Sequence, residues 1–197
     1  YVASTNSGSL EVFRLEDDSL RRLVSIQTYD ARFGKYNDFY DVKLNPENGH
    51  LYVYAISGFT FYKYELVNDN QLTLVGSREN TYWEWYNRVD KFGDDIVTIS
   101  EKGVKVWNTD IMDVVDSLPV ANAAAPYNVR SFNGRHILNV EGNYLGIYDR
   151  ETRAAASPVA LNYKTNPGNR AAYQDDNQNI YVMDDYYAKK FSTDGVL

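Results

Sequence analysis

One phrase recurs along this chain and constrains its fold more than any other feature. It is a short alternating strand that ends in an aromatic and a polar residue, followed by a polar turn and a second strand. The aromatic–polar pairs are Phe13-Arg14, Tyr64-Glu65, Trp107-Asn108, Tyr148-Asp149 and Phe191-Ser192. They are 51, 43, 41 and 43 residues apart. A repeat of about 40 to 50 residues that contains only strands predicts an all-β fold built from similar sheets.

Alternating residues and turn signals assign strands to most of the chain. The segments are 2–6, 9–16, 20–28, 39–45, 50–56, 58–66, 72–80, 87–92, 95–100, 103–110, 113–121, 127–132, 135–141, 143–150, 155–162, 169–174, 179–185 and 186–193. Turns at Asn45-Pro46-Glu47-Asn48-Gly49 and Ser57-Gly58 have the residues that hairpins need. A helical turn within Thr109–Ser117 is the alternative, but the place of this segment in the repeat favours a turn followed by a strand.

The repeat resembles the β-propeller repeats grouped as WD-repeat, YVTN-type and LVIVD-type. The matching residues are Val106-Trp107-Asn108 and Ile147-Tyr148-Asp149, each followed by a polar turn and a strand. The resemblance implies one propeller domain over residues 1–197, or part of one, with about five four-stranded antiparallel blades. These blades would span approximately 1–28, 39–80, 87–121, 127–162 and 169–197.

The first and last repeats each have three predicted strands. The strand at Val2–Asn6 has no inner strand before it, and the strand at Tyr186–Thr193 has no outer strand after it. A closed propeller usually avoids such open edges. We therefore expect residues 1–197 to be a portion of a longer protein, cut in mid-blade at both ends, or to be completed by a partner chain. Alone, they should aggregate or form oligomers.

Composition narrows the function classes. The formal net charge of −7 argues against general binding to nucleic acid, which requires clustered Lys and Arg. The chain contains no Cys, so disulfides and thiolate metal sites are excluded. No apolar run reaches the roughly 18 to 20 residues of a membrane span. The compartment stays open, with a cell envelope or extracellular location favoured over the cytoplasm.

The long connections between predicted blades carry most of the candidate binding residues. Long loops on a rigid scaffold are where binding residues usually lie. The candidates for a ligand or partner surface are Tyr29, Arg32, Phe33, Tyr36, Tyr82, Trp83, Glu84, Trp85, Tyr86, Tyr127 and Tyr163.

The densest of these connections is Thr81–Arg88, with four aromatic residues around Glu84. In an extended segment, Trp83 and Trp85 would point one way, and Tyr82, Glu84 and Tyr86 the other. One face could be buried while the other stacks on a sugar or on a partner's side chains. The alternative is that both Trp side chains pack between blades.

Polar residues alternate along the predicted inner strands, where they could line a central channel. The candidates are Asp41, Lys43, Arg88, Asp90, Arg130 and Arg170, together with Asn128. The three Arg residues in this set, Arg88, Arg130 and Arg170, could hold an anion. The alternative is a set of ion pairs between blades.

The sequence indicates no metal site, cofactor or catalytic group. Asp175–Asn179 resembles the start of a calcium loop, but the sixth position is Ile180 and the twelfth is Tyr186, so a turn is the better interpretation. His50 and His136 are isolated, whereas a metal site needs about three or four converging ligands.

Three functions are consistent with these patterns. The leading hypothesis is a non-catalytic scaffold that presents an aromatic loop face to a protein partner, or to the remaining blades of a longer chain. The second is a cell-envelope or secreted propeller that binds glycans. The third is a propeller hydrolase or lyase that uses carboxylates such as Asp41 or Asp90 at the channel.

Overall fold

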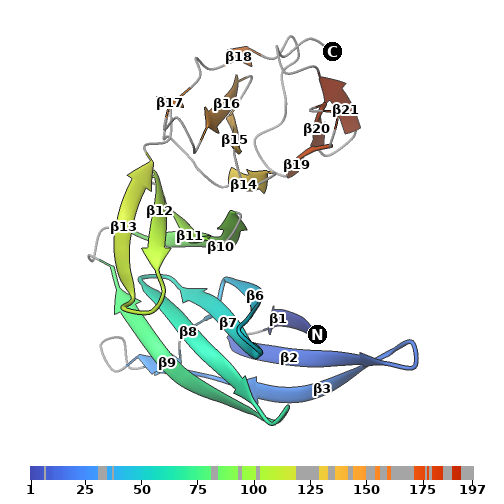
Figure 1. Cartoon of the computed structure of the whole chain (residues 1–197), viewed down its shortest axis with the longest axis vertical. Helices are drawn as coiled ribbons and strands as arrows, with labels where there is room; N and C mark the ends of the chain where they lie inside the picture. The colour runs from blue at the N-terminus through green and yellow to red at the C-terminus, as the bar shows by residue number, and fades with distance from the viewer. Residues whose placement is uncertain are drawn as a thin grey trace. The chain divides into compact units, whose positions relative to one another are not determined.

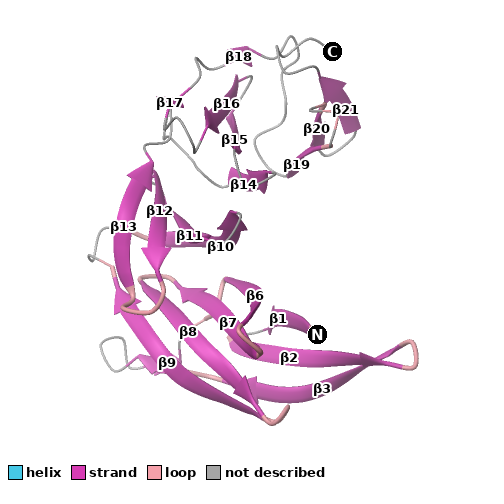
Figure 2. Ribbon diagram, in the orientation of Figure 1, coloured by secondary structure: helices cyan, strands magenta, loops and turns pink. Residues whose placement is uncertain are grey.

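The computed structural model describes most of the N-terminal half of the chain and selected strands of the rest. The described residues are 1–6, 8–30, 35–36, 38–80, 84–92, 95–100, 103–118, 129–132, 136–141, 144–149, 154–155, 159–160, 171–175, 177, 179–183 and 188–191. This part of the chain consists of antiparallel sheets and turns and contains no helix (Figure 2). The predicted all-β class is therefore confirmed.

The strands form successive sheets in chain order (Figure 1). The first sheet is β1 (Val2–Asn6), β2 (Ser9–Glu16) and β3 (Ser19–Ile26), and the second is β6 (Asp41–Glu47), β7 (His50–Ser57), β8 (Thr60–Val67) and β9 (Gln71–Glu79). The third sheet is β10 (Tyr86–Phe92), β11 (Asp95–Ser100), β12 (Gly103–Asn108) and β13 (Asp113–Leu118). The fourth is β14 (Val129–Phe132), β15 (His136–Glu141), β16 (Tyr144–Asp149), β17 (Ala154–Ala155) and β18 (Val159–Ala160). The fifth is β19 (Ala171–Gln174), β20 (Ile180–Met183) and β21 (Ala188–Phe191), and a small hairpin pairs β4 (Tyr29–Asp30) with β5 (Lys35–Tyr36).

The chain divides into two compact units. One comprises Tyr1–Asp90 and Trp107–Val115 and contains the first two sheets, and the other comprises Lys91–Val106 and Asp116–Leu197 and contains the fourth and fifth. The first unit contains Tyr40, Phe59 and Trp85, which form an exposed aromatic cluster.

Most strand predictions are confirmed, and one predicted strand, one predicted connection and one predicted turn need correction. The segment after Trp107 is a turn followed by β13, as predicted. The predicted strand 155–162 is two short segments, β17 and β18, which both pair with β16. The connection 29–38 contains the β4–β5 hairpin, because its two ends pair across the connection. The predicted five-residue turn at 45–49 is a two-residue turn, and β6 continues through Pro46.

Turn chemistry sets the hairpin registers. The β6–β7 turn has Asn48 and Gly49 at φ 51° and 82°, the left-handed pair that joins twisted strands most tightly. Asp17 and Asp18 make the same conformation between β2 and β3, at φ 45° and 62°. Asp and Asn tolerate this region better than other side chains with a Cβ. The polar turns of the repeat are thus short because their residues accept positive φ.

The first two sheets share a β-bulge at the repeated aromatic residue. In the β2–β3 ladder the register shifts between Val12 and Phe13, and in the β8–β9 ladder it shifts between Lys63 and Tyr64. A bulge bends the strand and increases its twist. The repeat found in the sequence therefore corresponds to a repeated backbone irregularity.

The core of the first unit lies against both faces of the second sheet. Tyr62, Tyr64 and Leu66 of β8 pack with Leu10 and Val12 of β2 in one cluster. On the opposite face of β8, the ring of Phe61 lies 4.8 Å from that of Trp107 and 5.9 Å from that of Tyr54. Side chains alternate between the faces of a strand, so β8 is buried on both sides.

Candidate functional site

An exposed aromatic cluster lies where the β7–β8 turn meets the residues before β6 and β10. We call Tyr40, Phe59 and Trp85 the aromatic patch. The Trp85 ring centroid lies 5.3 Å from that of Tyr40 and 4.8 Å from that of Phe59, and both pairs have T-shaped geometry. Trp85 remains 37% exposed and Tyr40 47% exposed. The patch is therefore packed firmly enough to hold its rings and open enough to contact another molecule.

Backbone hydrogen bonds hold this patch in place. The amide of Tyr40 donates to Ile56 at 3.0 Å, that of Asn80 to Phe59 at 2.6 Å, and that of Tyr86 to Gly58 at 2.7 Å. Gly58 has a φ of +53°, and a Cβ there would lie 3.2 Å from two carbons of the Trp85 ring. Gly58 is therefore needed both for the positive-φ turn and for the space that the Trp85 indole occupies.

The residues on either side of Trp85 point into the protein. Glu84 and Tyr86 are buried, and the Tyr86 ring lies 6.3 Å from that of Trp107. Burial raises the pKa of the Tyr86 hydroxyl above its ordinary value of 10. The alternation across Glu84, Trp85 and Tyr86 therefore leaves the indole as the exposed group of these three predicted site residues.

Several predicted binding residues cannot be placed on this patch. Tyr29 pairs with Tyr36 through the backbone of the β4–β5 hairpin. Arg32, Phe33, Tyr82, Trp83, Tyr127 and Tyr163 lie outside the described residues. Tyr40 and Phe59 are added by the structure. Their signal in the sequence was only their position beside a strand end and after a turn glycine.

The Tyr40 hydroxyl, at the edge of the patch, has a pKa above its ordinary value of 10. Partial burial of the side chain is the main cause, and the negative charge of Asp38 contributes less. Asp38 itself is exposed. The patch therefore combines exposed rings, a neutral phenol and a nearby carboxylate.

The predicted channel residues form structural contacts where they are described. Lys43 of β6 lies 2.6 Å from Asp90 of β10, which is an ion pair between the first strands of consecutive sheets. Asp41 accepts backbone N–H groups from Val42 at 3.0 Å and Val89 at 3.1 Å. Burial nevertheless raises the pKa of Asp41. These contacts correspond to the predicted alternative of ion pairs between sheets.

The remaining channel candidates are less fully described. Arg88 is half-buried, and its charge favours the ionised form of Asp41. Arg130 lies on β14, where only the backbone is described, and Asn128 and Arg170 lie outside the described residues. A channel that binds an anion stays a prediction.

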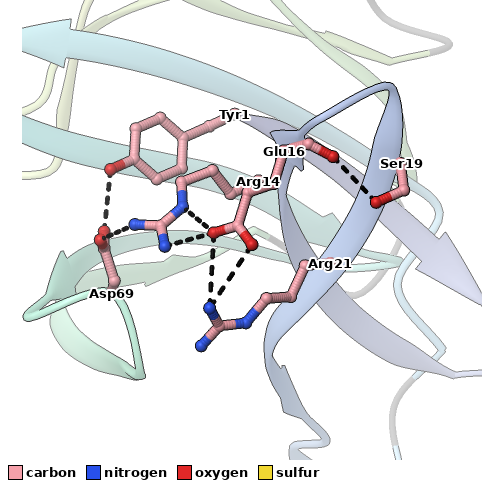
Figure 3. Close-up of polar contacts among 6 residues, drawn as sticks. All are labelled: Tyr1, Arg14, Glu16, Ser19, Arg21 and Asp69. Carbon is pink, nitrogen blue, oxygen red and sulfur yellow. Dashed lines mark hydrogen bonds and ion pairs between the residues drawn. The ribbon is translucent and has the colours of Figure 1, made fainter.

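A polar network joins the first sheet to the β8–β9 turn (Figure 3). Arg14 lies 2.5 Å from an Asp69 oxygen, and Tyr1 donates to the other Asp69 oxygen at 2.9 Å. Arg14 also donates through Nε to Glu16 at 2.6 Å, and Arg21 lies 3.4 Å from Glu16. Carboxylates already bind both guanidinium groups, so the network is not an anion site. It holds the β8–β9 turn against the first sheet.

A buried lysine holds a second turn in place. The Lys63 side chain is only 4% exposed, and its amine lies 4.3 Å from the centroid of the Tyr52 ring. The amine donates to the Thr109 carbonyl at 3.2 Å and lies 3.7 Å from an Asp110 oxygen. It thus fixes the β12–β13 turn on β8. Sequence reasoning missed this role because a lysine in an alternating strand normally faces solvent.

The calcium-like segment is a turn in the β19–β20 hairpin. The Asp175 carboxylate accepts N–H groups of Asn177 and Asn179 and the Tyr181 hydroxyl, at 2.8 to 3.1 Å. These donors lower its pKa, with the Asn179 side chain contributing most. Within the described residues, no three His, Asp or Glu side chains converge as metal ligands.

A shallow hollow of about 580 Å³ lies beside the β6–β7 turn. Its lining includes Tyr1, Leu44, Pro46, His50 and Leu51. The His50 ring nitrogen lies 2.6 Å from Glu65. The lining mixes apolar carbon with the polar side chains of Glu47, Asn48 and His50, so the hollow indicates no particular class of ligand.

Comparison with known protein families and with curated proteins gave no match. In the described part of the chain, no helix has the length and apolar character needed to cross a membrane.

Proposed function

We propose that this chain is a β-propeller-type repeat module that binds a protein partner through the aromatic patch. The propeller assignment is supported by meander sheets in chain order and by the shared bulge at Phe13 and Tyr64. The ion pair between Lys43 and Asp90 also supports it, because it joins the first strands of two consecutive sheets.

The observation that carries the binding proposal is the exposure of the Trp85 indole between two other rings. Large aromatic side chains in protein interfaces contribute most when neighbouring groups already hold them in place. Trp85 is held by Tyr40, Phe59 and the Gly58 turn, so little side-chain freedom remains to be lost on binding. Asp38 would supply a charged rim next to the rings.

The test is partner capture with the purified chain and the variant Trp85→Ala. Removal of a central Trp should weaken recovery of a specific partner by more than about tenfold. Ile111→Ala is the matched control, because Ile111 is 68% exposed and lies outside the patch. Equal recovery by wild-type protein and a folded Trp85→Ala variant would refute the proposal.

A glycan is the second candidate ligand, favoured by the exposed indole and by the Asp38 carboxylate, whose charge acts on the neighbouring Tyr40 hydroxyl. Sugar rings stack on aromatic faces while carboxylates accept their hydroxyl groups. Titration of an oligosaccharide panel should then change the Trp fluorescence of wild-type protein and not that of Trp85→Phe. If no oligosaccharide changes the fluorescence while partner capture is retained, glycan binding is refuted and protein binding remains.

A further inference from the structure

The hairpin end of the first sheet exposes an apolar pair beside two carboxylates. Leu15 and Leu20 face each other across β2 and β3 and are 61% and 55% exposed. Asp17 and Asp18 form the adjoining left-handed turn and are also exposed. We call these four residues the acidic hairpin end.

The same position in the second sheet is packed against a neighbouring sheet. Leu66 pairs with Leu72 across β8 and β9, as Leu15 pairs with Leu20. Leu66 is only 9% exposed, and both leucines belong to the apolar cluster shared with the first sheet. In the adjoining turn, Asp69 forms the ion pair with Arg14 of β2. A hairpin end of this design therefore docks on the sheet that precedes it.

A second junction in the same unit shows what such a turn docks on. Lys63 of β8 lies opposite Tyr54 of β7, with its amine 5.9 Å from the Tyr54 ring centroid. The β12–β13 turn, which is the equivalent turn of the third sheet, covers this lysine through Thr109 and Asp110. In both junctions, a carboxylate from one hairpin turn reaches a cation on the preceding sheet.

The fifth sheet repeats the receiving half of this junction, and within the part of the chain that the structure describes no turn is seen to cover its lysine. Lys190 of β21 lies opposite Tyr181 of β20, and its amine is again 5.9 Å from the tyrosine ring centroid. Both residues lie 127 positions after Lys63 and Tyr54, the same offset that separates Tyr64 from Phe191. Lys190 is exposed, whereas Lys63 is buried.

We propose that two copies of the chain associate head to tail, with the acidic hairpin end of one copy seated on Lys190 and Tyr181 of the other. The leucine pair supplies the apolar contact, as Leu66 and Leu72 do in the second sheet. The carboxylates of Asp17 and Asp18 meet the Lys190 amine, and this ion pair sets the orientation more than the affinity. The contact joins two different surfaces, so it is heterologous and can continue to further copies.

Zero-length carbodiimide crosslinking tests the contact directly, because the reagent joins a carboxylate to an amine that touches it. Equal amounts of ¹⁴N- and ¹⁵N-labelled protein are mixed, crosslinked and digested. The expected product joins Asp17 or Asp18 to Lys190 with one peptide light and the other heavy. Absence of this peptide, or its formation only within one copy, would overturn the proposal.

Variants then connect the contact to association, measured by sedimentation velocity over a range of protein concentrations. Leu15→Ser/Leu20→Ser should weaken association by about tenfold or more, because it removes the apolar contact. Lys190→Ala should weaken it by about two- to fivefold, as expected for an ion pair at a rim. Asp17→Asn/Asp18→Asn should match the lysine variant, since Asn tolerates the left-handed turn.

The matched control is Lys189→Ala, which removes the same charge from the same strand but from its opposite face. It should associate like wild-type protein, and so should Trp85→Ala, which separates this contact from the aromatic patch. Thermal unfolding by circular dichroism verifies that each variant is folded. A wild-type chain that stays monomeric at all concentrations, or a Lys190→Ala variant that associates like wild type, would contradict the proposal.

Discussion

The first and second sheets carry the same hairpin in two different surroundings. Both have a bulge before the repeated aromatic residue, Phe13 or Tyr64, and both turn through a pair of left-handed residues. Their burial nevertheless differs. Most of β8 is buried on both faces, whereas β2 becomes exposed toward its turn.

Local sequence therefore determines the hairpin itself, whereas the neighbouring elements determine how far it is buried. Leu15 and Leu66 occupy the same place in the repeat, yet one is 61% exposed and the other 9%. Equal side chains at equal backbone positions should therefore contribute unequally to stability.

The largest effect is expected for leucine truncation at the two equivalent positions. Leu66→Ala should lower the free energy of unfolding by about 2 to 4 kcal/mol, because it leaves a cavity in the cluster shared by the two sheets. Leu15→Ala should change it by less than about 0.5 kcal/mol in dilute protein. Urea denaturation of both variants provides the measurement. Similar losses would mean that the two hairpin ends are equally packed.

The next effect concerns the residue opposite Lys63 and Val12 in the two ladders. The first sheet has Val24 there, but the second has Gly76, where a Cβ would lie 2.5 Å from Met112 Cγ. Gly76→Ala should therefore destabilise the protein by about 1 to 3 kcal/mol through overpacking. Thermal melts of Gly76→Ala in wild-type and Met112→Ala backgrounds measure the coupling. An equal cost in both backgrounds would place the strain elsewhere.

A smaller effect of opposite sign is expected at the repeated aromatic residue. The buried Tyr64 hydroxyl has no hydrogen-bond partner among the described residues, whereas the first sheet has Phe13 at this position. Tyr64→Phe should raise the free energy of unfolding by about 1 kcal/mol. Tyr54→Phe is the control and should lower it by a similar amount, because Tyr54 donates to Thr109 at 3.1 Å. Urea titrations compare the two, and a loss in both would show that the Tyr64 hydroxyl contributes.

The smallest effect is a difference in pH dependence. The hydrogen bond from Arg14 holds the pKa of Glu16, in the first sheet, below its ordinary value of 4.5. Its stabilising effect is therefore present above that value and is lost as pH falls through the lowered folded-state pKa. Glu16→Gln should flatten the acid side of the profile of unfolding midpoint against pH.

Asp41 of the second sheet should act in the opposite direction. Burial raises its pKa, so its ionised form costs stability above the folded-state pKa and this cost disappears on acidification. Carboxylate chemical shifts followed by NMR would give both titrations. A Glu16 midpoint at or above 4.5 would contradict the hydrogen bond from Arg14 to Glu16.

Local patterns predicted most of the fold. Period-two alternation and turn residues such as Asn48-Gly49 act within a hairpin, so the strands and the turn before β13 could be read from the sequence. The small β4–β5 hairpin and the split between β17 and β18 were missed. Their segments are only two residues long, too short for alternation to be recognised.

The candidate site was predicted only in part, because it depends on contacts between distant segments. The sequence singled out Trp85, but Tyr40 and Phe59 join it only when three connections meet. The sequence offered ion pairs between blades as the alternative to a channel without indicating which residues would pair, and the structure pairs Lys43 with Asp90. Burial of Lys63 gave no sequence signal, since it depends on a turn more than 40 residues away.

The enclosure of Lys63 also has a chemical consequence. An amine that is covered by Tyr52, Tyr54 and the turn at Thr109 cannot meet an acylating reagent, and a protease specific for lysine cannot bind the β8 backbone around it. Modification at this residue therefore requires the turn to lift from the strand. The rate of acylation at Lys63, compared with that at exposed lysines, therefore measures how readily this junction opens in the native protein.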